Sequence, residues 1–364
     1  MKENSIHLPG LNGLRAIAAL SVVVAHISLK GIADFGLANL FDLQMSGYGV
    51  TLFFVISGFL ITYLLLHELD NNGDVNIKKF YVRRILRIWP IYYLFLTICI
   101  GVFIVLGKTQ EIILKEMWFY VFFAANVPFI FQQGIMILVH YWSIGVEEQF
   151  YLFWPWVVRI SKNRLLEVTI IIFFILFVIK ILFWWRLGTA SFEYRFLSVS
   201  RFHCMMIGAI GGILYFKKQI DFVNLFSNRI VQLVSWSIFF LMGFNIVHIP
   251  PVIAQEVIAI AAVSMIIGQI TVTKRLFNLE NRVCDFIGKI SYGIYVIHPL
   301  IILLLSRFFK NLNIEIVVKC ILVYSTVVVF TIFVAWLSYN YFEKPFLKLK
   351  RKFSVVQSSD SLIF

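Results

Sequence analysis

The sequence predicts an all-α polytopic membrane protein, with about ten transmembrane helices plus one re-entrant or short helix. Of its 364 residues, 60% are apolar and only 14% are charged, whereas an ordinary soluble domain has about 25% charged residues. The apolar residues fall in runs of about 20, which is the length that crosses a bilayer as a helix. The 38 Phe, 15 Tyr and 9 Trp also exclude a disordered chain.

Ten runs are long enough to cross the bilayer. The predicted spans, in chain order, are 14–30, 48–67, 85–106, 142–160, 167–186, 201–217, 229–247, 252–272, 288–309 and 317–341. A further apolar segment, 115–135, contains Asn126 and Pro128. These residues interrupt an apolar helix, so we expect this segment to be re-entrant or short rather than a full crossing.

The net charge of +13 indicates membrane orientation rather than nucleic-acid binding, because Lys and Arg collect in cytoplasmic loops. The 31–47 loop has no Lys or Arg, whereas 68–87 has five. If 115–135 does not cross, the later basic clusters fall on the same side as 68–87. We therefore expect both termini in the cytoplasm, a membrane domain over 7–342 and a basic cytoplasmic tail over 343–364.

The cysteines predict no covalent or metal-bound framework. Cys99, Cys204, Cys284 and Cys320 lie far apart in or beside apolar runs. Without a CxxC or other metal-ligand spacing, we expect neither a disulfide nor a zinc site.

The first span contains two ionisable residues, Arg15 and His26, in LRAIAALSVVVAH. Ionisable groups inside a membrane are costly and therefore suggest function. Eleven residues correspond to ~1100° of helix rotation and ~16 Å of rise, so both side chains lie on one face. They could hold the charged and reactive ends of one substrate, with His26 as a general base. Alternatively, Arg15 snorkels to the interface and His26 bonds a neighbouring helix.

The third span begins with RRILRIWPIYY, where Arg84 and Arg87 (i, i+3) and Arg83 and Arg87 (i, i+4) share a helix face. Guanidinium groups bind phosphates bidentately, so this face could hold a phosphorylated cofactor. Residue pattern alone favours a different interpretation, in which the arginines anchor the helix at the cytoplasmic headgroups.

A polar stripe opens the fourth span, in HYWSIGVEEQFYLFWP. Ser143, Glu147 and Tyr151 recur every four residues and so face the bundle interior together. A carboxylate there could orient a histidine or accept a sugar hydroxyl, and we favour a functional role for Glu147. Glu148 could equally lie at the interface beside headgroups.

Two further residues are weaker candidates. His298 follows Tyr292 in SYGIYVIHP and is either a site residue or a hydrogen-bonding group at a helix end. Arg201 begins the 201–217 span on the predicted outer side, where it could contact an acceptor or a lipid phosphate.

These four motifs, in this order, resemble the acyltransferase family 3 integral membrane enzymes over about residues 11–342. LNGLRAIAALSVVVAH is similar to the family's Arg–ten residues–His motif, and RRILRIWPIYY to its Arg-x-x-Arg region. HYWSIGVEEQFYLFWP resembles its Trp-Ser…Glu-x-Gln-Phe-Tyr element, and SYGIYVIHP its late Ser-Tyr…His element. The matching residues are Arg15, His26, Arg84, Arg87, Trp142, Ser143, Glu147, Gln149, Phe150, Tyr151, Ser291, Tyr292 and His298. Thr51 and His203 depart from the family pattern, where acidic residues are common.

The resemblance implies an O-acetyltransferase of a bacterial inner membrane. Arg84, Arg87 and Arg15 would bind the phosphates of acetyl-CoA or another acyl-CoA, with no metal. His26 would act as base or carry the acyl group, and Glu147 would orient it. The acceptor would be a cell-envelope polysaccharide, such as lipopolysaccharide, or its lipid-linked precursor. Oligomeric state stays open.

Two alternatives remain. The same chemistry could acylate a small molecule, or the chain could transport or flip lipid-linked sugars. A transporter commonly has duplicated halves, and no internal repeat is evident in this sequence.

Overall fold

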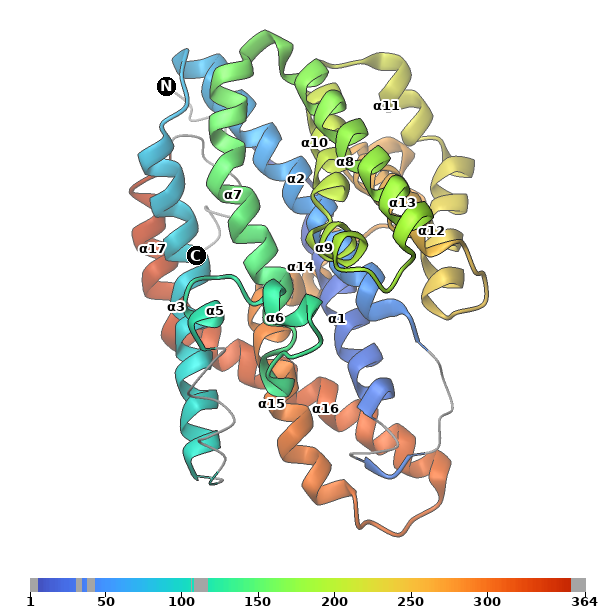
Figure 1. Cartoon of the computed structure of the whole chain (residues 1–364). Helices are drawn as coiled ribbons and strands as arrows, with labels where there is room; N and C mark the ends of the chain where they lie inside the picture. The colour runs from blue at the N-terminus through green and yellow to red at the C-terminus, as the bar shows by residue number, and fades with distance from the viewer. Residues whose placement is uncertain (1–5, 31–34, 38–42, 106, 108–116, 355–364) are drawn as a thin grey trace.

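A computed structural model describes residues 6–30, 35–37, 43–105, 107 and 117–354 (Figure 1). All of the elements in these ranges are helical. The α-helices are α1 (Leu11–Lys30), α2 (Met45–Asn72), α3 (Ile77–Val105), α5 (Met117–Val121), α6 (Asn126–Ile130), α7 (Tyr141–Ser161), α8 (Leu165–Leu187), α9 (Phe192–Ser200), α10 (Phe202–Phe216), α11 (Ile220–Phe226), α12 (Arg229–Gly243), α13 (Pro251–Ile270), α14 (Arg282–Lys289), α15 (Ser291–Phe309), α16 (Ile316–Ser338) and α17 (Lys344–Arg351). Short helices of other types are η2 (Met136–Leu138), η3 (Lys162–Arg164), η4 (Val272–Lys274) and η5 (Tyr339–Glu343).

The predicted all-α polytopic fold is confirmed. By length and composition, 8 stretches of the described residues could cross a membrane, or up to 9 with the bent pair α11 and α12. One of the eight, Tyr141–Leu187, contains both α7 and α8, between which the chain reverses (Figure 1). These two helices correspond to the predicted spans 142–160 and 167–186.

The segment predicted as re-entrant or short contains only short helices where it is described. Both α5 and α6 have five residues, which corresponds to ~7.5 Å of helix each and is far less than a bilayer core. The part of 115–135 that precedes Met117 lies outside the described residues.

One contact between turns supports the predicted sidedness. Asp74 follows α2, and Arg159 lies in the last turn of α7. The Arg159 guanidinium donates two hydrogen bonds to the Asp74 carboxylate, at 2.7 and 2.6 Å. The α2–α3 and α7–α8 turns therefore lie at the same end of the bundle, as expected if residues between α3 and α7 do not cross.

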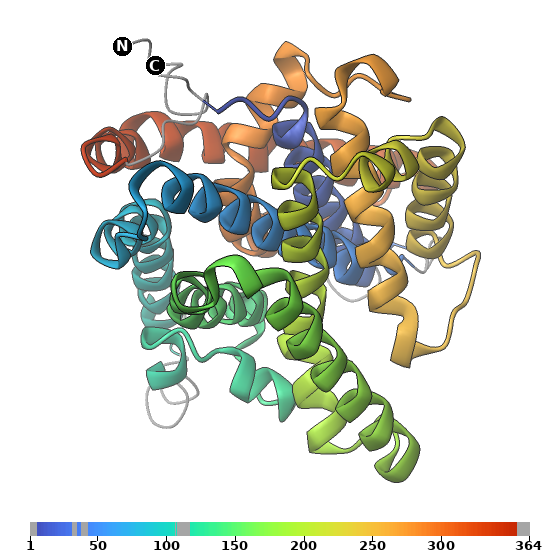
Figure 2. The same ribbon diagram turned by 90° about the horizontal axis from the view of Figure 1, so that it is seen from above.

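Close packing of α2 on α10 forms the centre of the bundle (Figure 2). A methyl group at Gly58 would overlap the Met205 carbonyl, and one at Gly208 would overlap the Val55 carbonyl. Glycines at such crossings let two backbones approach closely, which is how membrane helices gain packing energy. The glycines of the sequence therefore determine which helix lies beside α2.

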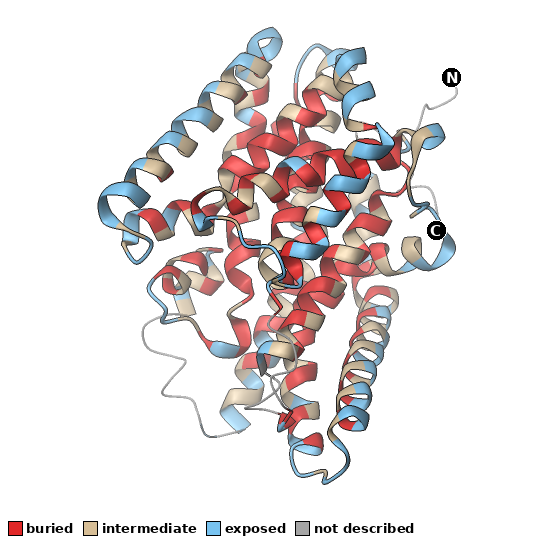
Figure 3. Cartoon of the chain, turned by 90° about the vertical axis from the view of Figure 1, so that its right-hand side faces the viewer, coloured by how far each residue is buried: buried red, intermediate tan, exposed pale blue. Residues whose placement is uncertain are grey.

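Burial decreases from this centre towards the outer helices (Figure 3). The α8 helix has only three buried residues, Leu165, Thr169 and Lys180, and it projects from the bundle in Figure 2. Its exposed side chains include Phe174, Leu182 and other large apolar residues. Such a surface suits contact with lipid.

The sidedness can be measured with single cysteines in a cysteine-free background. We expect Ser161→Cys to react with a membrane-impermeant maleimide only from the side that labels Asn71→Cys, because the Asp74–Arg159 contact joins these turns. His248→Cys, between α12 and α13, should label from the opposite side. Labelling of Ser161→Cys together with His248→Cys would overturn this topology.

The glycine packing predicts a stability difference. Gly208→Ala should lower the melting temperature of the purified protein, because overpacking a close contact costs about 1–3 kcal/mol. Gly101→Ala is the matched control, since nothing lies within 4 Å of a Cβ at this exposed helical position. Equal melting temperatures for the two variants would contradict the close approach of α2 and α10.

Candidate active site

A cavity runs into the bundle between α1, α2, α3, α7 and α15. Its empty space is about 1360 Å³, including the part that is open to solvent. Charged and hydroxyl side chains line it together with apolar ones. Its polar lining consists of Asn12, Arg15, Ser57, Arg84, Arg87, Ser143, Glu147, Tyr151, Ser291, Tyr292, Tyr295 and Lys350.

The structure brings most of the predicted site residues to this cavity. Seven of them line it: Arg15, Arg84, Arg87, Ser143, Glu147, Tyr151 and Tyr292. The other four, His26, Trp142, Arg201 and His298, are not part of its lining. The cavity therefore joins the cationic and acidic groups, while the histidines occupy a separate position.

The cationic part of the cavity contains three arginines from two helices. Arg15 comes from the first turns of α1, and Arg84 and Arg87 come from one face of α3. The Arg84 guanidinium lies over the Tyr151 ring at 5.3 Å, and its Nε is buried without a hydrogen-bond partner. This cluster suits a multiply charged anion such as a phosphorylated ligand.

Arg83, which the spacing places on the same face as Arg87, has a different role. Its guanidinium donates to Glu68 at 3.0 Å and to the Phe353 carbonyl at 3.0 Å. It therefore holds α2, α3 and the end of the described chain together and does not line the cavity.

The polar stripe of α7 faces the cavity as its four-residue spacing predicts. Glu147 accepts a hydrogen bond from Ser57 at 2.8 Å. Glu148 points to α3 instead, where it accepts a hydrogen bond from the Trp89 indole at 3.0 Å. The two neighbouring carboxylates therefore face different elements, with Glu147 in the cavity and Glu148 against α3.

One partner of His26 is His298. Its Nδ1 lies 2.7 Å from the His298 Nε2, and the two ring planes are inclined by 24° with centroids 5.0 Å apart. His26 is half-buried, whereas His298 is fully buried in α15. These residues are 272 positions apart in the chain, so spacing alone could not pair them.

The hydrogen bonds determine which nitrogens carry protons. The His298 Nδ1 lies 2.7 Å from the Tyr295 carbonyl, which can only accept, so this nitrogen must donate. A neutral His298 then has an unprotonated Nε2, which accepts from the Nδ1–H of His26. A neutral His26 then carries its proton on Nδ1 and its lone pair on Nε2, which is the tautomer that a base or nucleophile at Nε2 requires.

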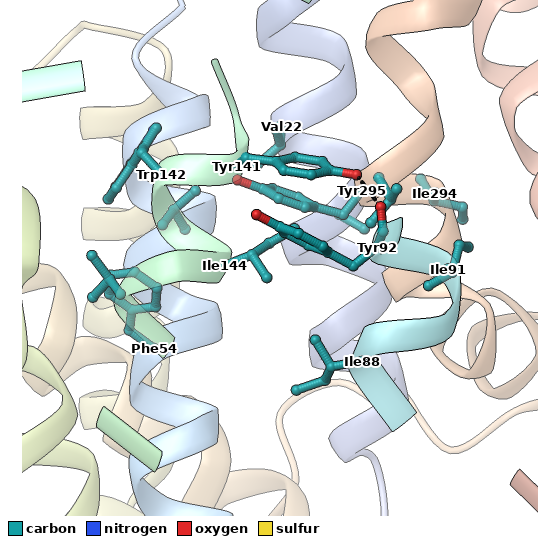
Figure 4. Close-up of a cluster of buried hydrophobic side chains, with 14 of the residues drawn as sticks. Val22, Phe54, Ile88, Ile91, Tyr92, Tyr141, Trp142, Ile144, Ile294 and Tyr295 are labelled. Atoms are coloured by element: carbon teal, nitrogen blue, oxygen red, sulfur yellow. Dashed lines mark hydrogen bonds between the residues drawn. The ribbon is translucent and has the colours of Figure 1, made fainter. Parts of the chain in front are cut away.

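Tyr295 connects the cavity to this histidine pair. Its hydroxyl lies 2.5 Å from the Ser143 Oγ and donates to the His140 carbonyl at 3.1 Å. Its ring lies 5.9 Å from the ring of His298. Figure 4 shows Tyr295 in a packed cluster with Val22, Tyr92 and Tyr141. Tyr295 thus lines the cavity and also neighbours His298.

His140 is a site neighbour that sequence reasoning did not select. Its ring lies 5.4 Å from that of His298. Its Nε2 donates to the Val296 carbonyl at 3.1 Å, and its Nδ1 is buried without a hydrogen-bond partner. The only sequence signal was its place at the start of HYWSIGVEEQ.

Arg201 and Trp142 form a second group, which does not line the cavity but packs on its lining residue Phe54 through Trp142. The Arg201 guanidinium lies over the Trp142 ring at 5.2 Å and donates to the Gly47 carbonyl at 2.6 Å and to the Thr51 hydroxyl at 2.9 Å. Phe129 stacks on Trp142, with ring centroids 5.0 Å apart. These contacts fix the start of α10 against α2 and α7.

The two departures from the expected pattern, Thr51 and His203, each have a polar partner. Thr51 accepts a hydrogen bond from Arg201, as described above. His203 Nε2 lies 3.1 Å from Glu256, which also pairs with the buried Lys180 at 2.9 Å. The buried ion pair of Lys180 and Glu256 satisfies charges that lipid would not tolerate.

The donor set of the site suits an organic anion. No group of three or more His, Cys, Asp or Glu residues that could hold a metal ion occurs in the described ranges. Arg15, Arg84 and Arg87 are the residues that could hold phosphates.

Comparison with known proteins identifies relatives over nearly the whole chain. A protein of Staphylococcus aureus strain COL, named as a "Putative O-acetyltransferase", is 29% identical over 372 residues, which cover 94% of this chain and 58% of that relative. The O-acetyltransferase OatA of S. aureus strain NCTC 8325 is 27% identical over 377 residues, covering 94% of this chain and 57% of OatA. The chain thus spans less than three fifths of these relatives. No solved structure matches.

The family comparison agrees with the motifs and the fold. A family model described as "Acyltransferase domain" matches residues 8–340, which include all of the helices that line the cavity except α17. The chain therefore belongs to the acyltransferase family 3.

Proposed function

We propose that this protein is a membrane O-acetyltransferase that moves an acetyl group from acetyl-CoA to a hydroxyl of a cell-envelope polysaccharide or its lipid-linked precursor. The observation that carries the proposal is the cavity that joins three arginines to the Ser143–Tyr295 pair, where the Tyr295 ring lies 5.9 Å from that of His298, a partner of His26. The names of the relatives support acetyl as the group transferred.

The arginines would bind the phosphates of the donor. Arg84 and Arg87 present guanidinium groups from one helix face, and Arg15 adds a third from α1. Arg15 precedes His26 by eleven residues, or ~16 Å along the helix axis. A donor held by its phosphates at one end could thus extend its thioester along α1 towards the histidine pair.

His26 would then activate the acceptor. Its Nε2 takes the proton of the acceptor hydroxyl, and the oxygen attacks the thioester carbonyl carbon. The carbon–sulfur bond breaks, and the thiolate leaves with the proton from His26, so the products are an O-acetyl ester and free CoA. In a second route, Nε2 itself attacks the thioester and carries the acetyl group before the acceptor removes it. His298 holds the required tautomer in either route.

The charge distribution supports an orientation in the bacterial inner membrane. The first turns of α3, which contain Lys78, Lys79 and three arginines, and α17 are rich in Lys and Arg, and such segments stay in the cytoplasm. Acetyl-CoA would therefore enter at the arginines from the cytoplasm, with both termini on this side. The acceptor would reach His26 from the opposite side.

Loss of His26 tests the role of the base. His26→Ala should reduce acetyl transfer from labelled acetyl-CoA to envelope glycan by at least about 100-fold, because general acid–base groups contribute about 10²–10⁴-fold. Its affinity for CoA should stay within two-fold of wild type. Equal acetyl transfer by the variant and the wild-type protein would show that His26 is not the base. Movement of glycan across the membrane without consumption of acetyl-CoA would favour the transport alternative.

The arginines of α3 test the donor site. Arg84→Ala with Arg87→Ala should weaken CoA binding by about ten-fold or more, because a hydrogen bond to a charged group is worth about 1.5–3 kcal/mol. The matched control is Lys78→Ala with Lys79→Ala, which removes two charges from exposed positions of the same helix. Calorimetry would measure the CoA affinity of both double variants. Equal affinities would indicate that the arginines only determine the orientation of the helix in the membrane.

A further inference from the structure

The segment after residue 340 lies beyond the family match, yet it is packed against the candidate site. The sequence suggested a separate tail from residue 343. Instead, η5 continues from α16, and α17 lies along α3, as Figures 1 and 2 show. The Arg83 hydrogen bonds to Glu68 and to the Phe353 carbonyl fasten the end of this segment to α2 and α3.

A second cavity lies between α17 and the arginines. It is lined by Asn12, Arg15, Arg87, Lys289, Tyr292, Tyr339, Glu343, Leu347, Lys350 and Arg351. Five of these side chains are basic and one is acidic. Its empty space is about 600 Å³, including the part that is open to solvent.

The two cavities are contiguous. Both are lined by Asn12, Arg15, Arg87, Tyr292 and Lys350. An anion held by Arg15 and Arg87 could therefore continue from the first cavity into the second. The second cavity adds Lys289 from the end of α14 and Arg351 from the end of α17. These positions surround Arg87 with cations from elements far apart in the sequence.

We propose that α17 completes the donor site, with Lys350, Arg351 and Lys289 binding phosphates of the nucleotide end of the acyl donor. This inference rests on the proposed function, in which the donor is an acyl-CoA. The charge of the second cavity suits a ligand with several phosphates, because Arg and Lys bind phosphate oxygens through charge-assisted hydrogen bonds. The thioester arm would then occupy the first cavity. A short thioester without phosphates would not bind the basic residues of α17.

Acidic lipid headgroups offer the same phosphate chemistry, so the experiment must distinguish the two sources. The full-length protein would be placed in phosphatidylcholine nanodiscs, which carry no net charge, and in nanodiscs with phosphatidylglycerol. Binding of CoA and of pantetheine, which lacks phosphates, would be measured by calorimetry. Transfer would be measured with acetyl-CoA and with acetyl-pantetheine.

Lys350→Ala with Arg351→Ala should weaken CoA binding at least about ten-fold in phosphatidylcholine and raise KM for acetyl-CoA. Use of acetyl-pantetheine should stay within two-fold. The control is Lys348→Ala with Lys352→Ala, which removes two charges from exposed residues at the same end of the chain. Lys350→Arg with Arg351→Lys keeps the charges and should keep the affinity, which would separate charge loss from misfolding.

The outcomes separate this inference from the proposed function. If the wild-type protein neither binds CoA nor uses acetyl-CoA, the proposed donor is wrong, and the inference is wrong as well. If wild type binds CoA and the Lys350/Arg351 variant binds it equally well, the inference alone is overturned. It is also overturned if the variant changes only the binding of phosphatidylglycerol.

Discussion

The cost of placing charge in lipid is the constraint on which the site depends. An ionisable side chain in a membrane span is stable only if it faces the bundle interior and finds polar partners. Arg15, Arg84 and Glu147 come from three different helices, and all three line one cavity. The buried Lys180 follows the same rule through its ion pair with Glu256. In a chain with so few charges, the interior charges therefore mark two places, the cavity and the Lys180–Glu256 pair.

Tyr295 connects the cavity to the histidine pair through its side chain and its backbone carbonyl. Its side chain lines the cavity and bonds Ser143, while its carbonyl fixes the proton of His298 and, through it, the tautomer of His26. A shift of α15 at this residue would thus change both the wall of the cavity and the base. In this arrangement α15 contributes to the orientation of His26 through His298, and Glu147 lines the cavity.

The sequence predicts the helices and the faces they present, because both follow from local apolar and polar periodicity. It correctly places Ser143, Glu147 and Tyr151 on one interior stripe. It does not predict that Arg83 pairs with Glu68 instead of lining the cavity, or that His298 contacts His26. These contacts depend on how distant helices pack. For the same reason, a basic segment such as α17 looks like a tail in sequence, although it lies against α3.

The central claim is that the donor binds at the arginines and the acyl group leaves past Tyr295 on the opposite side. Proteoliposomes of uniform orientation, determined by labelling Asn71→Cys, would test it with labelled acetyl-CoA supplied on one side and the glycan acceptor on the other. The account predicts transfer only when acetyl-CoA is on the side of the α2–α3 turn. Transfer only when acetyl-CoA is on the His26 side would contradict it.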